Sequence, residues 1–360
     1  MTDATRSLAR PVAWSPASAL LRDAAMMSAL AVLVPASIVA AVTIGPAEIS
    51  PAATWGTVLA HVSGGPAVLP PTLDAIVWQI RLPRALTAAA VGAGLALCGA
   101  VLQSTTRNSL ADPFLLGISA GASLGAACVI LLSAAIALPL AAFAGASLAL
   151  AMTLALARDG TTVVPGRAIL AGVAVSAFFG SLTSLGIFWF ANGDSYREIL
   201  GWLLGSLAGS SWTGTALVAA ALLLTAPLLM GSARTLDAFL LGDHAAASLG
   251  VSVVRARWML LVVATLLTAI MVSVSGSIGF VGLVVPHAVR LLGAVRHRLL
   301  LPCSALGGAV LMVWADTAAR SLFEPRELPV GVVTALLGAP AFGLLLLRRG
   351  SVRARREQRA

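Results

Sequence analysis

Residues 81–126 read RLPRALTAAAVGAGLALCGAVLQSTTRNSLADPFLLGISAGASLGA, and this stretch decides the class of fold. Two apolar spans flank a short polar turn between Arg107 and Pro113. The turn is too polar for a plain membrane anchor, and the spans are too apolar for a soluble core. The second span carries glycine at every fourth position, at Gly117, Gly121 and Gly125. This spacing predicts a bare helix face against which a neighbouring helix packs closely in lipid.

The composition is that of an integral membrane protein. Hydrophobic residues make up 59% of the 360 residues and charged residues 10%, with a mean hydropathy of +0.97. Soluble domains carry about a quarter charged residues. No gap between apolar runs exceeds about forty residues, near the low end of independent domains. We therefore expect one membrane domain over 1–360.

The chain contains enough apolar runs for a polytopic helical protein. A hydrocarbon core of about 30 Å needs about 20 residues of helix. Ten such runs occur, at 24–44, 85–104, 114–133, 136–156, 168–190, 213–231, 258–275, 281–295, 302–320 and 330–347. We predict an all-α fold of about ten transmembrane helices with both termini on the same side.

Arginine distribution predicts the orientation in the membrane. The 23 basic residues are all arginine; placing the termini in the cytoplasm puts eighteen inside and five outside, as the positive-inside rule requires. The rule accounts for the basic C-terminus better than nucleic-acid binding does, so we expect no nucleic-acid partner. We therefore expect a multi-pass protein of the cytoplasmic (inner) membrane, with cytoplasmic tails at 1–23 and 348–360.

Motifs for chemistry within the chain are sparse. Because there is no lysine, a Walker A phosphate loop, which needs Gly-Lys-Ser/Thr, cannot form. The four histidines show no metal-ligand spacing, so we expect neither a metal site nor catalytic residues. Any ATP hydrolysis would belong to another chain.

The acid Asp316 lies well inside an apolar span, four residues before Arg320. That spacing favours a local ion pair on the helix, whereas a proton relay would suit a proton-coupled secondary transporter. A second ambiguous segment, 273–287, is rich in glycine and lies between two spans. It is either a tight turn or a bent helix beside a pathway, which lipid tolerates only where protein or a water-filled cavity covers the backbone.

Three segments outside the spans are too structured for simple loops, and such loops often bind partners. Two are expected outside, 45–80 and 191–211, and the latter repeats the four-residue spacing at Gly201, Gly205 and Gly209. The third, 232–257, is expected inside and is patterned as two short helices broken near Gly242.

Six motifs in series resemble the FecCD family, the permease subunits of type II ABC importers for iron-siderophores, haem and cobalamin. They are RLPR at 81–84, GAVLQSTTRNSLADPFLLGISAGASLGA at 99–126, GWLLGSLAGSSW at 201–212, LGDHAAASLGV at 241–251, SGSIGFVGLVVPHAVR at 275–290 and ELPVGVVTALLGAPAF at 327–342. The resemblance implies a fold like that of the cobalamin permease, functional as a homodimer with the pathway at its interface.

The same resemblance implies partners and no cofactor in this chain. ATP and magnesium would sit on two separate ABC ATPase subunits, and a periplasmic or lipid-anchored substrate-binding protein would dock outside. Docking is implied for Arg81, Arg84 and Arg320, with snorkelling to lipid headgroups as the alternative. ATPase coupling is implied for Leu241, Gly242, Ala246, Leu249 and Gly250, and the inner gate or pathway for Pro165, Gly166 and Gly172.

The function expected from this resemblance is import of an iron chelate, a ferric siderophore or haem, by alternating access. A cobalamin importer is the alternative. A proton-coupled secondary transporter and a non-transporting membrane scaffold are the rivals from other classes.

Overall fold

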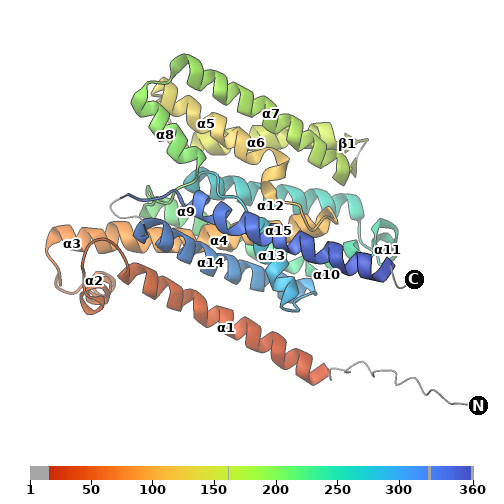
Figure 1. The fold of residues 1–360 in the computed structure, drawn as a ribbon, viewed down its shortest axis with the longest axis horizontal. Coiled ribbons are helices and arrows are strands. Elements are labelled where there is room, and N and C mark those ends of the chain that lie inside the picture. Colours follow the sequence, from red (N-terminus) through yellow and green to blue (C-terminus); the bar gives the residue numbers. More distant parts are fainter. Residues whose placement is uncertain (1–15, 161, 323–325, 358–360) are drawn as a thin grey trace, which may run out of the picture.

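The computed structural model describes residues 16–160, 162–322 and 326–357, and helices dominate it (Figure 1). The helices are α1 (Pro16–Thr43), α2 (Pro51–Ser63), α3 (Pro71–Ala75), η1 (Ile76–Arg81), α4 (Leu82–Thr105), η2 (Pro113–Leu116), α5 (Ile118–Leu132), α6 (Leu138–Ala157), α7 (Pro165–Phe190), α8 (Gly193–Leu203), α9 (Trp212–Gly231), α10 (Ala233–Leu240), α11 (Asp243–Ser248), α12 (Val253–Ser275), α13 (Val281–Leu291), α14 (His297–Ser321) and α15 (Val330–Glu357). Two short strands, β1 (Arg158–Asp159) and β2 (Thr162–Val163), pair antiparallel. The predicted all-α class is confirmed.

Among the described residues, seven helices are long and apolar enough to cross a membrane, and α5, α13 and the apolar part of α15 are shorter apolar helices. Together these cover the ten runs expected from the sequence. The expected tails differ in extent. Residues 16–23 already belong to α1, and α15 continues to Glu357, so part of each basic tail is helical. Residues 1–15 and 358–360 lie outside the described residues.

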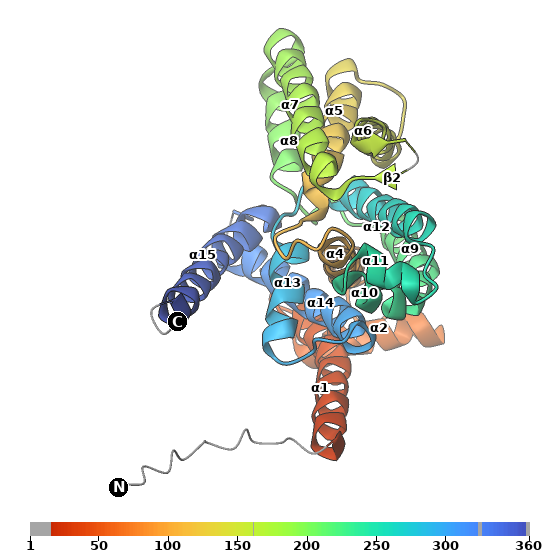
Figure 2. The same cartoon turned by 90° about the vertical axis from the view of Figure 1, so that its right-hand side faces the viewer.

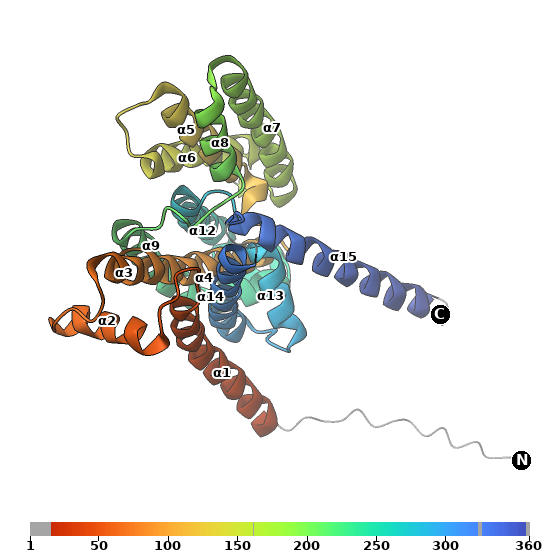
Figure 3. The same cartoon turned by 60° about the vertical axis from the view of Figure 1, so that its left-hand side comes forward.

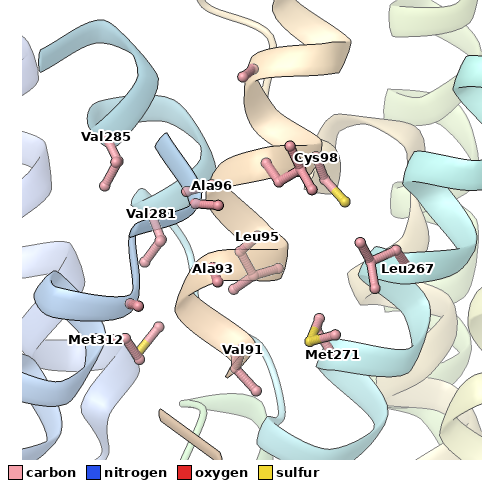
Figure 4. Packing of buried hydrophobic residues seen from close by; sticks show 14 of the residues in the cluster. Val91, Ala93, Leu95, Ala96, Cys98, Leu267, Met271, Val281, Val285 and Met312 are labelled. Carbon is pink, nitrogen blue, oxygen red and sulfur yellow. The ribbon is translucent and has the colours of Figure 1, made fainter. Parts of the chain in front are cut away.

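Helix α4 forms the axis of the bundle. Of the most apolar part of Pro71–Thr105, 94% is buried, and Figure 2 shows α9, α12, α13 and α14 around α4. Figure 4 shows side chains of α4, such as Leu95, between Leu267 of α12 and Val281 of α13. Because α4 has protein on all sides, its sequence is apolar around the whole helix, as expected for a buried helix.

Glycines bring the backbones of α4 and its neighbours into direct contact. A Cβ at Gly92 would overlap the carbonyl oxygen of Gly308 on α14, and a Cβ at Gly308 would overlap that of Gly92. Gly99 lies equally close to Gly282 of α13. Lipid provides no hydrophobic drive for helix association, so close packing at small residues has to hold the helices together.

A second layer, of α5, α6, α7 and α8, lies beside α12 (Figure 1). Within it, Gly121 and Gly125 of α5 face the backbone of α6 at Gly145 and Ala141. Gly117 has a different role from the other two, because its φ of +80° turns the chain from η2 into α5. Two of the three glycines expected to form a packing face therefore lie at a helix–helix contact.

The helix that leads into α4 contains a wide turn at the RLPR motif. Residues 76–81 form a π-helical segment, in which the N–H of Leu82 donates to the carbonyl of Val77, five residues earlier. Pro83 follows and has no N–H with which to continue a regular ladder. Such π-bulges often occur at functional positions, and this one carries Arg81.

The segment between α12 and α13 is a break covered by protein. Gly276 and Phe280 both have positive φ, +68° and +69°. A Cβ at Gly276 would overlap the carbonyl oxygen of Trp202, and the N–H of Ser206 donates to the carbonyl of Ser275 at 2.9 Å. The backbone freed by the break is therefore partnered by the 202–206 segment, as non-helical backbone in a membrane requires.

The packing at Gly92 predicts a position-specific effect of adding one methyl group. Gly92→Ala should destabilise the fold by about 1–3 kcal/mol because the α4–α14 backbones must separate. At Gly201 in α8, where a Cβ meets no atom within 4 Å in the described chain, Gly201→Ala should stabilise by about 0.5–1 kcal/mol. Thermal unfolding in lipid nanodiscs measures the stability of both variants. Equal shifts of the unfolding midpoint in Gly92→Ala and Gly201→Ala would contradict the close packing at Gly92.

Candidate functional site

The bundle has two structured ends, which lie on opposite sides in Figure 1. The α2 end carries α2, α3 and α8, and the α11 end carries α10 and α11. Every residue for which the sequence predicts docking or coupling lies at one of these ends. Figure 3 shows that α15 leans away from the rest of the bundle.

At the α11 end, α10 and α11 form a small platform with an apolar edge. Leu241 and Leu249 are 68% and 65% exposed, whereas Ala246 is fully buried. Gly242 and Gly250 have φ of +103° and +83°, so they allow the sharp turns before and after α11. The structure thus brings together the five residues expected to couple to a partner. Leu241 and Leu249 form an exposed apolar edge, Ala246 is buried, and Gly242 and Gly250 lie at the two turns.

Charged residues hold α11 against α12. Arg257 donates from Nη2 and Nη1 to the two carboxylate oxygens of Asp243, at 2.8 and 3.1 Å, and Arg107 lies 3.6 Å from the same carboxylate. The hydrogen bond from Arg257, with the nearby charges of Arg257 and Arg107, lowers the pKa of Asp243. The sequence shows Arg257 only as one more cytoplasmic charge, so this contact was missed.

A triad of Asp237, His297 and Ser104, buried at the histidine and serine, holds α10. The carboxylate of Asp237 accepts from the backbone N–H of His297 at 3.1 Å and contacts its Nδ1 at 2.6 Å. The other ring nitrogen, Nε2, lies 2.5 Å from the hydroxyl of Ser104. A serine, a histidine and an aspartate in this order resemble a hydrolase triad, but Ser104 and His297 are 2% and 0% exposed. No substrate reaches the serine, so the arrangement is structural and not catalytic.

At the α2 end, three arginines gather beneath the surface. Arg84 donates from Nε to both oxygens of Asp316 at 3.0 Å and from Nη1 to Glu327 at 2.8 Å. Arg81 and Arg320 bond to backbone carbonyls at the end of α1 and just after it, including Ala47 at 2.6 Å and Ile44 at 2.6 Å. Helix α1 has no basic residue in its last turn, so these arginines satisfy its terminal carbonyls.

The three arginines for which the resemblance implies docking lie at the α2 end, but their guanidinium groups are already engaged within the chain. Arg81, Arg84 and Arg320 are 4%, 6% and 5% exposed and are bonded within the chain. The local pair expected between Asp316 and Arg320 is present at 3.8 Å, but Arg84 is the nearer partner of Asp316. A docking role stays a prediction, and in this conformation a partner's carboxylates would have to replace contacts that the arginines already make.

The expected gate residues lie at and near the start of α7. Pro165 begins the helix, and a Cβ at Gly166 would meet nothing within 4 Å. Gly172 differs, because a Cβ there would overlap the carbonyl oxygen of Leu115 in η2. In the described chain Gly172 therefore serves helix packing and does not line an open space. The gate role itself stays a prediction.

The glycines of the segment 191–211 also differ from their predicted role. Of these three glycines, Gly205 makes a close contact, with the backbone of Ser277, and it has a φ of +72°. A Cβ at Gly201 or Gly209 would meet nothing within 4 Å in the described chain. The spacing of four did not produce a packing face because α8 ends at Leu203, before the second and third glycines.

A half-buried carboxylate in the polar turn was not anticipated. Asp112 caps η2 by accepting from the N–H of Phe114 at 2.9 Å. Burial raises its pKa to about 6, although that hydrogen bond opposes the shift. The sequence signal was present, since an aspartate followed by proline is typical of a capped turn, but its burial depends on the tertiary packing of the turn.

Comparison with known protein families identifies the family of this chain. Residues 32–348 match the model of the FecCD transport family. The chain belongs to the FecCD transport family. It is therefore a permease of an ABC importer, a transport subunit and not itself an enzyme.

Relatives in this family transport different cargoes. The chain is 43% identical over 288 residues to the cobalamin import system permease of Halobacterium salinarum, which covers 79% of this chain and 77% of the relative. It is 42% identical to the Fe(3+) dicitrate permease of Escherichia coli (76% and 85% covered) and 42% identical to the hemin permease of Yersinia pestis (79% and 85%).

A solved structure shares the fold. A chain of an inward-facing ABC transporter of the metal-chelate type superposes with a TM-score of 0.78 at 32% identity, covering 90% of this chain and 99% of that one. The resemblance expected from the six motifs is confirmed at the level of family and fold.

The arginine cluster predicts a stability effect. Arg84→Leu should destabilise the protein by about 3–5 kcal/mol, since it leaves Asp316 as a buried charge without its nearest partner. The double variant Arg84→Leu, Asp316→Leu should lose less than Arg84→Leu alone. Thermal unfolding in nanodiscs measures this, with exposed Arg197→Leu as the control. If Arg84→Leu leaves stability unchanged, the cluster does not hold the α2 end together.

The raised pKa of Asp112 predicts a pH-dependent difference in stability between the wild-type protein and Asp112→Asn. Because the pKa of Asp112 in the folded protein is raised to about 6 from an unfolded value near 4, the desolvated charge destabilises the fold above pH 6. As the pH falls from 6 to 4 the folded protein takes up this proton and the penalty shrinks, and below about pH 4 it is gone. Asp112→Asn keeps the capping oxygen, so its unfolding midpoint should exceed the wild type at pH 7.5 and converge with it below about pH 4. A difference that is constant over this range would contradict the assignment.

Proposed function

We propose that this chain is the permease subunit of an importer that carries an iron chelate, a ferric siderophore or haem, across the cytoplasmic membrane. Two copies would enclose the pathway, two ABC ATPase subunits would bind at the α11 end and a periplasmic or lipid-anchored binding protein at the α2 end. Both termini would then be cytoplasmic. A cobalamin importer of the same build is the alternative, because a cobalamin permease is among the relatives.

The observation that carries the proposal is the platform of α10 and α11. Its exposed edge at Leu241 and Leu249 is apolar, yet Asp243 and Arg257 hold it rigidly against α12. An apolar patch on a rigid support at a membrane boundary suits a permanent protein partner. The chain has no lysine for a phosphate loop of its own, so an ATPase is the partner that an importer of this class requires.

The exposed faces of α7 and α15 support the homodimer. Leu170, Phe178 and Phe188 on α7 are at least half exposed, and Leu336 and Leu337 on α15 are similar. Both helices lie at the margin of the bundle (Figures 2 and 3). With apolar side chains on this face, a second copy would complete a pathway along which a large chelate slides without a tight polar site.

The internal acid favours ATP over a proton gradient as the energy source. Asp316 is bonded to Arg84 and lies near Arg320, so it is part of an ion-pair cluster and not an isolated carboxyl. A proton-coupled carrier needs a carboxyl that gains and loses a proton during transport. Under this proposal the arginines support the α2 end from beneath the surface at which the binding protein docks.

The proposal predicts the effect of a charge on the platform. Leu241→Asp should weaken ATPase binding by about tenfold or more, since it buries a charge in an apolar interface. Leu59→Asp is the matched control, because Leu59 is similarly exposed (66%) but lies in α2 at the other end. Co-purification of the ATPase with each variant measures the difference; equal loss, or no loss at Leu241, would contradict the platform assignment.

Transport itself is tested in proteoliposomes that contain the permease and its ATPase, with the binding protein added outside. We expect uptake of a radiolabelled ferric siderophore or haem that requires ATP and is insensitive to dissipation of the proton gradient. Uptake of cobalamin alone would favour the alternative cargo. Uptake driven by a proton gradient without ATP would contradict the proposal.

A further inference from the structure

We propose that His297 is a positioning residue for coupling, through which the triad Asp237–His297–Ser104 links the ATPase-binding platform to the central helix. This inference rests on the proposed function, since it assigns a role in the cycle of the same importer. The three side chains come from three elements: Asp237 from α10, His297 from the first turn of α14 and Ser104 from the last turn of α4. The triad therefore joins α10 to both helices of the α4–α14 contact.

The geometry of the ring makes it a bridge. His297 uses both nitrogens, Nδ1 toward Asp237 at 2.6 Å and Nε2 toward Ser104 at 2.5 Å. Asp237 also accepts from the backbone N–H of His297 at 3.1 Å, which satisfies a free N–H at the start of α14. The hydroxyl of Ser104 also lies 2.8 Å from the carbonyl oxygen of Ala100 within α4, and its single proton can go either to that oxygen or to Nε2. The bridge therefore runs from Asp237 at the platform through His297 to Ser104 of α4.

Burial differs along this chain of bonds. The side chain of Asp237 is 39% exposed at the platform, whereas that of His297 is fully buried. A displacement of α10 by a bound partner therefore acts on the bridge at its accessible end. In the buried part of the bridge no water replaces a broken bond, so breaking it is costly. Because breaking the bridge is costly, α4 and α14 should move together with α10 and should not separate from it.

Apolar packing alone would not fix this geometry. Leu236 and Phe239 of α10 are fully buried, and their contacts hold α10 against the bundle. Such contacts are non-directional, so a helix held only by them can slide or rotate. Hydrogen bonds are directional, and the triad fixes the angle of α10 relative to α4. Loss of the triad should leave the fold and the ATPase interface in place but loosen the transmission of motion.

The test separates coupling from folding. In proteoliposomes with the ATPase and the binding protein, both ATP hydrolysis and ferric chelate uptake are measured for Asp237→Ala, Asp237→Asn and His297→Gln. Asp237→Ala and His297→Gln should retain hydrolysis but import about tenfold less cargo per ATP, the loss of one hydrogen bond to a charged group. Asp237→Asn keeps an acceptor oxygen and should recover most of the coupling.

The double variant Asp237→Ala, His297→Gln should be no worse than either single variant, because the two residues act as one bridge. Thr87→Val is the matched control: Thr87 makes a buried hydrogen bond to Thr215 at 2.7 Å, toward the other end of α4, and its loss should not change cargo per ATP. If hydrolysis and uptake fall in parallel in the Asp237 and His297 variants, the triad serves only the fold and the inference is overturned.

A second measurement does not depend on transport or on the cargo. A spin label at Leu240 on the full-length permease in liposomes reports the mobility of the end of α10. Asp237→Ala and His297→Gln should increase that mobility, and Asp237→Asn should do so much less. Unchanged mobility in both variants would overturn the inference even if the chain imports its cargo. Wild-type protein that imports nothing while these mobility changes occur would instead count against the proposed function.

Discussion

Direct backbone contact around α4 is the constraint on which the rest of the structure depends. Glycine pairs such as Gly92 with Gly308 bring α14 against α4, and Gly99 brings α13 equally close. In lipid, where the hydrophobic effect does not press helices together, this contact area supplies the packing energy. Helix α4 is the fixed centre of the bundle. The platform of α10 and α11 and the exposed faces of α7 and α15 take their positions relative to it.

Polar groups appear where the axis meets the two ends of the molecule. Near the α2 end, Arg84 of α4 pairs with Asp316 of α14, while at the α11 end Ser104 of α4 meets His297 of α14. Each contact joins the same two helices, and each adds a further partner: Glu327, just before α15, in one case and Asp237 of α10 in the other. Directional bonds at both ends, with close apolar packing between them, suit a helix pair that moves as one body.

Much of this architecture could be predicted from the sequence, because hydropathy and glycine spacing are local signals. The ten apolar runs and the broken segment at 232–257 follow from composition alone. What could not be predicted depends on contacts between distant residues: Asp237 and His297 are 60 positions apart, and Arg84 and Asp316 are 232 apart. The arginine distribution puts Arg81, Arg84 and Arg320 on the outer side, but it does not reveal that α1 offers backbone carbonyls to Arg81 and Arg320.

The proposed function depends above all on the α10–α11 platform as the binding site of the ATPase. The most direct measurement is a cryo-electron microscopy structure of the permease with its ATPase and binding protein in a lipid nanodisc. We predict that Leu241 and Leu249 are buried against the ATPase. An ATPase bound elsewhere on the permease, with Leu241 and Leu249 left exposed, would contradict this assignment.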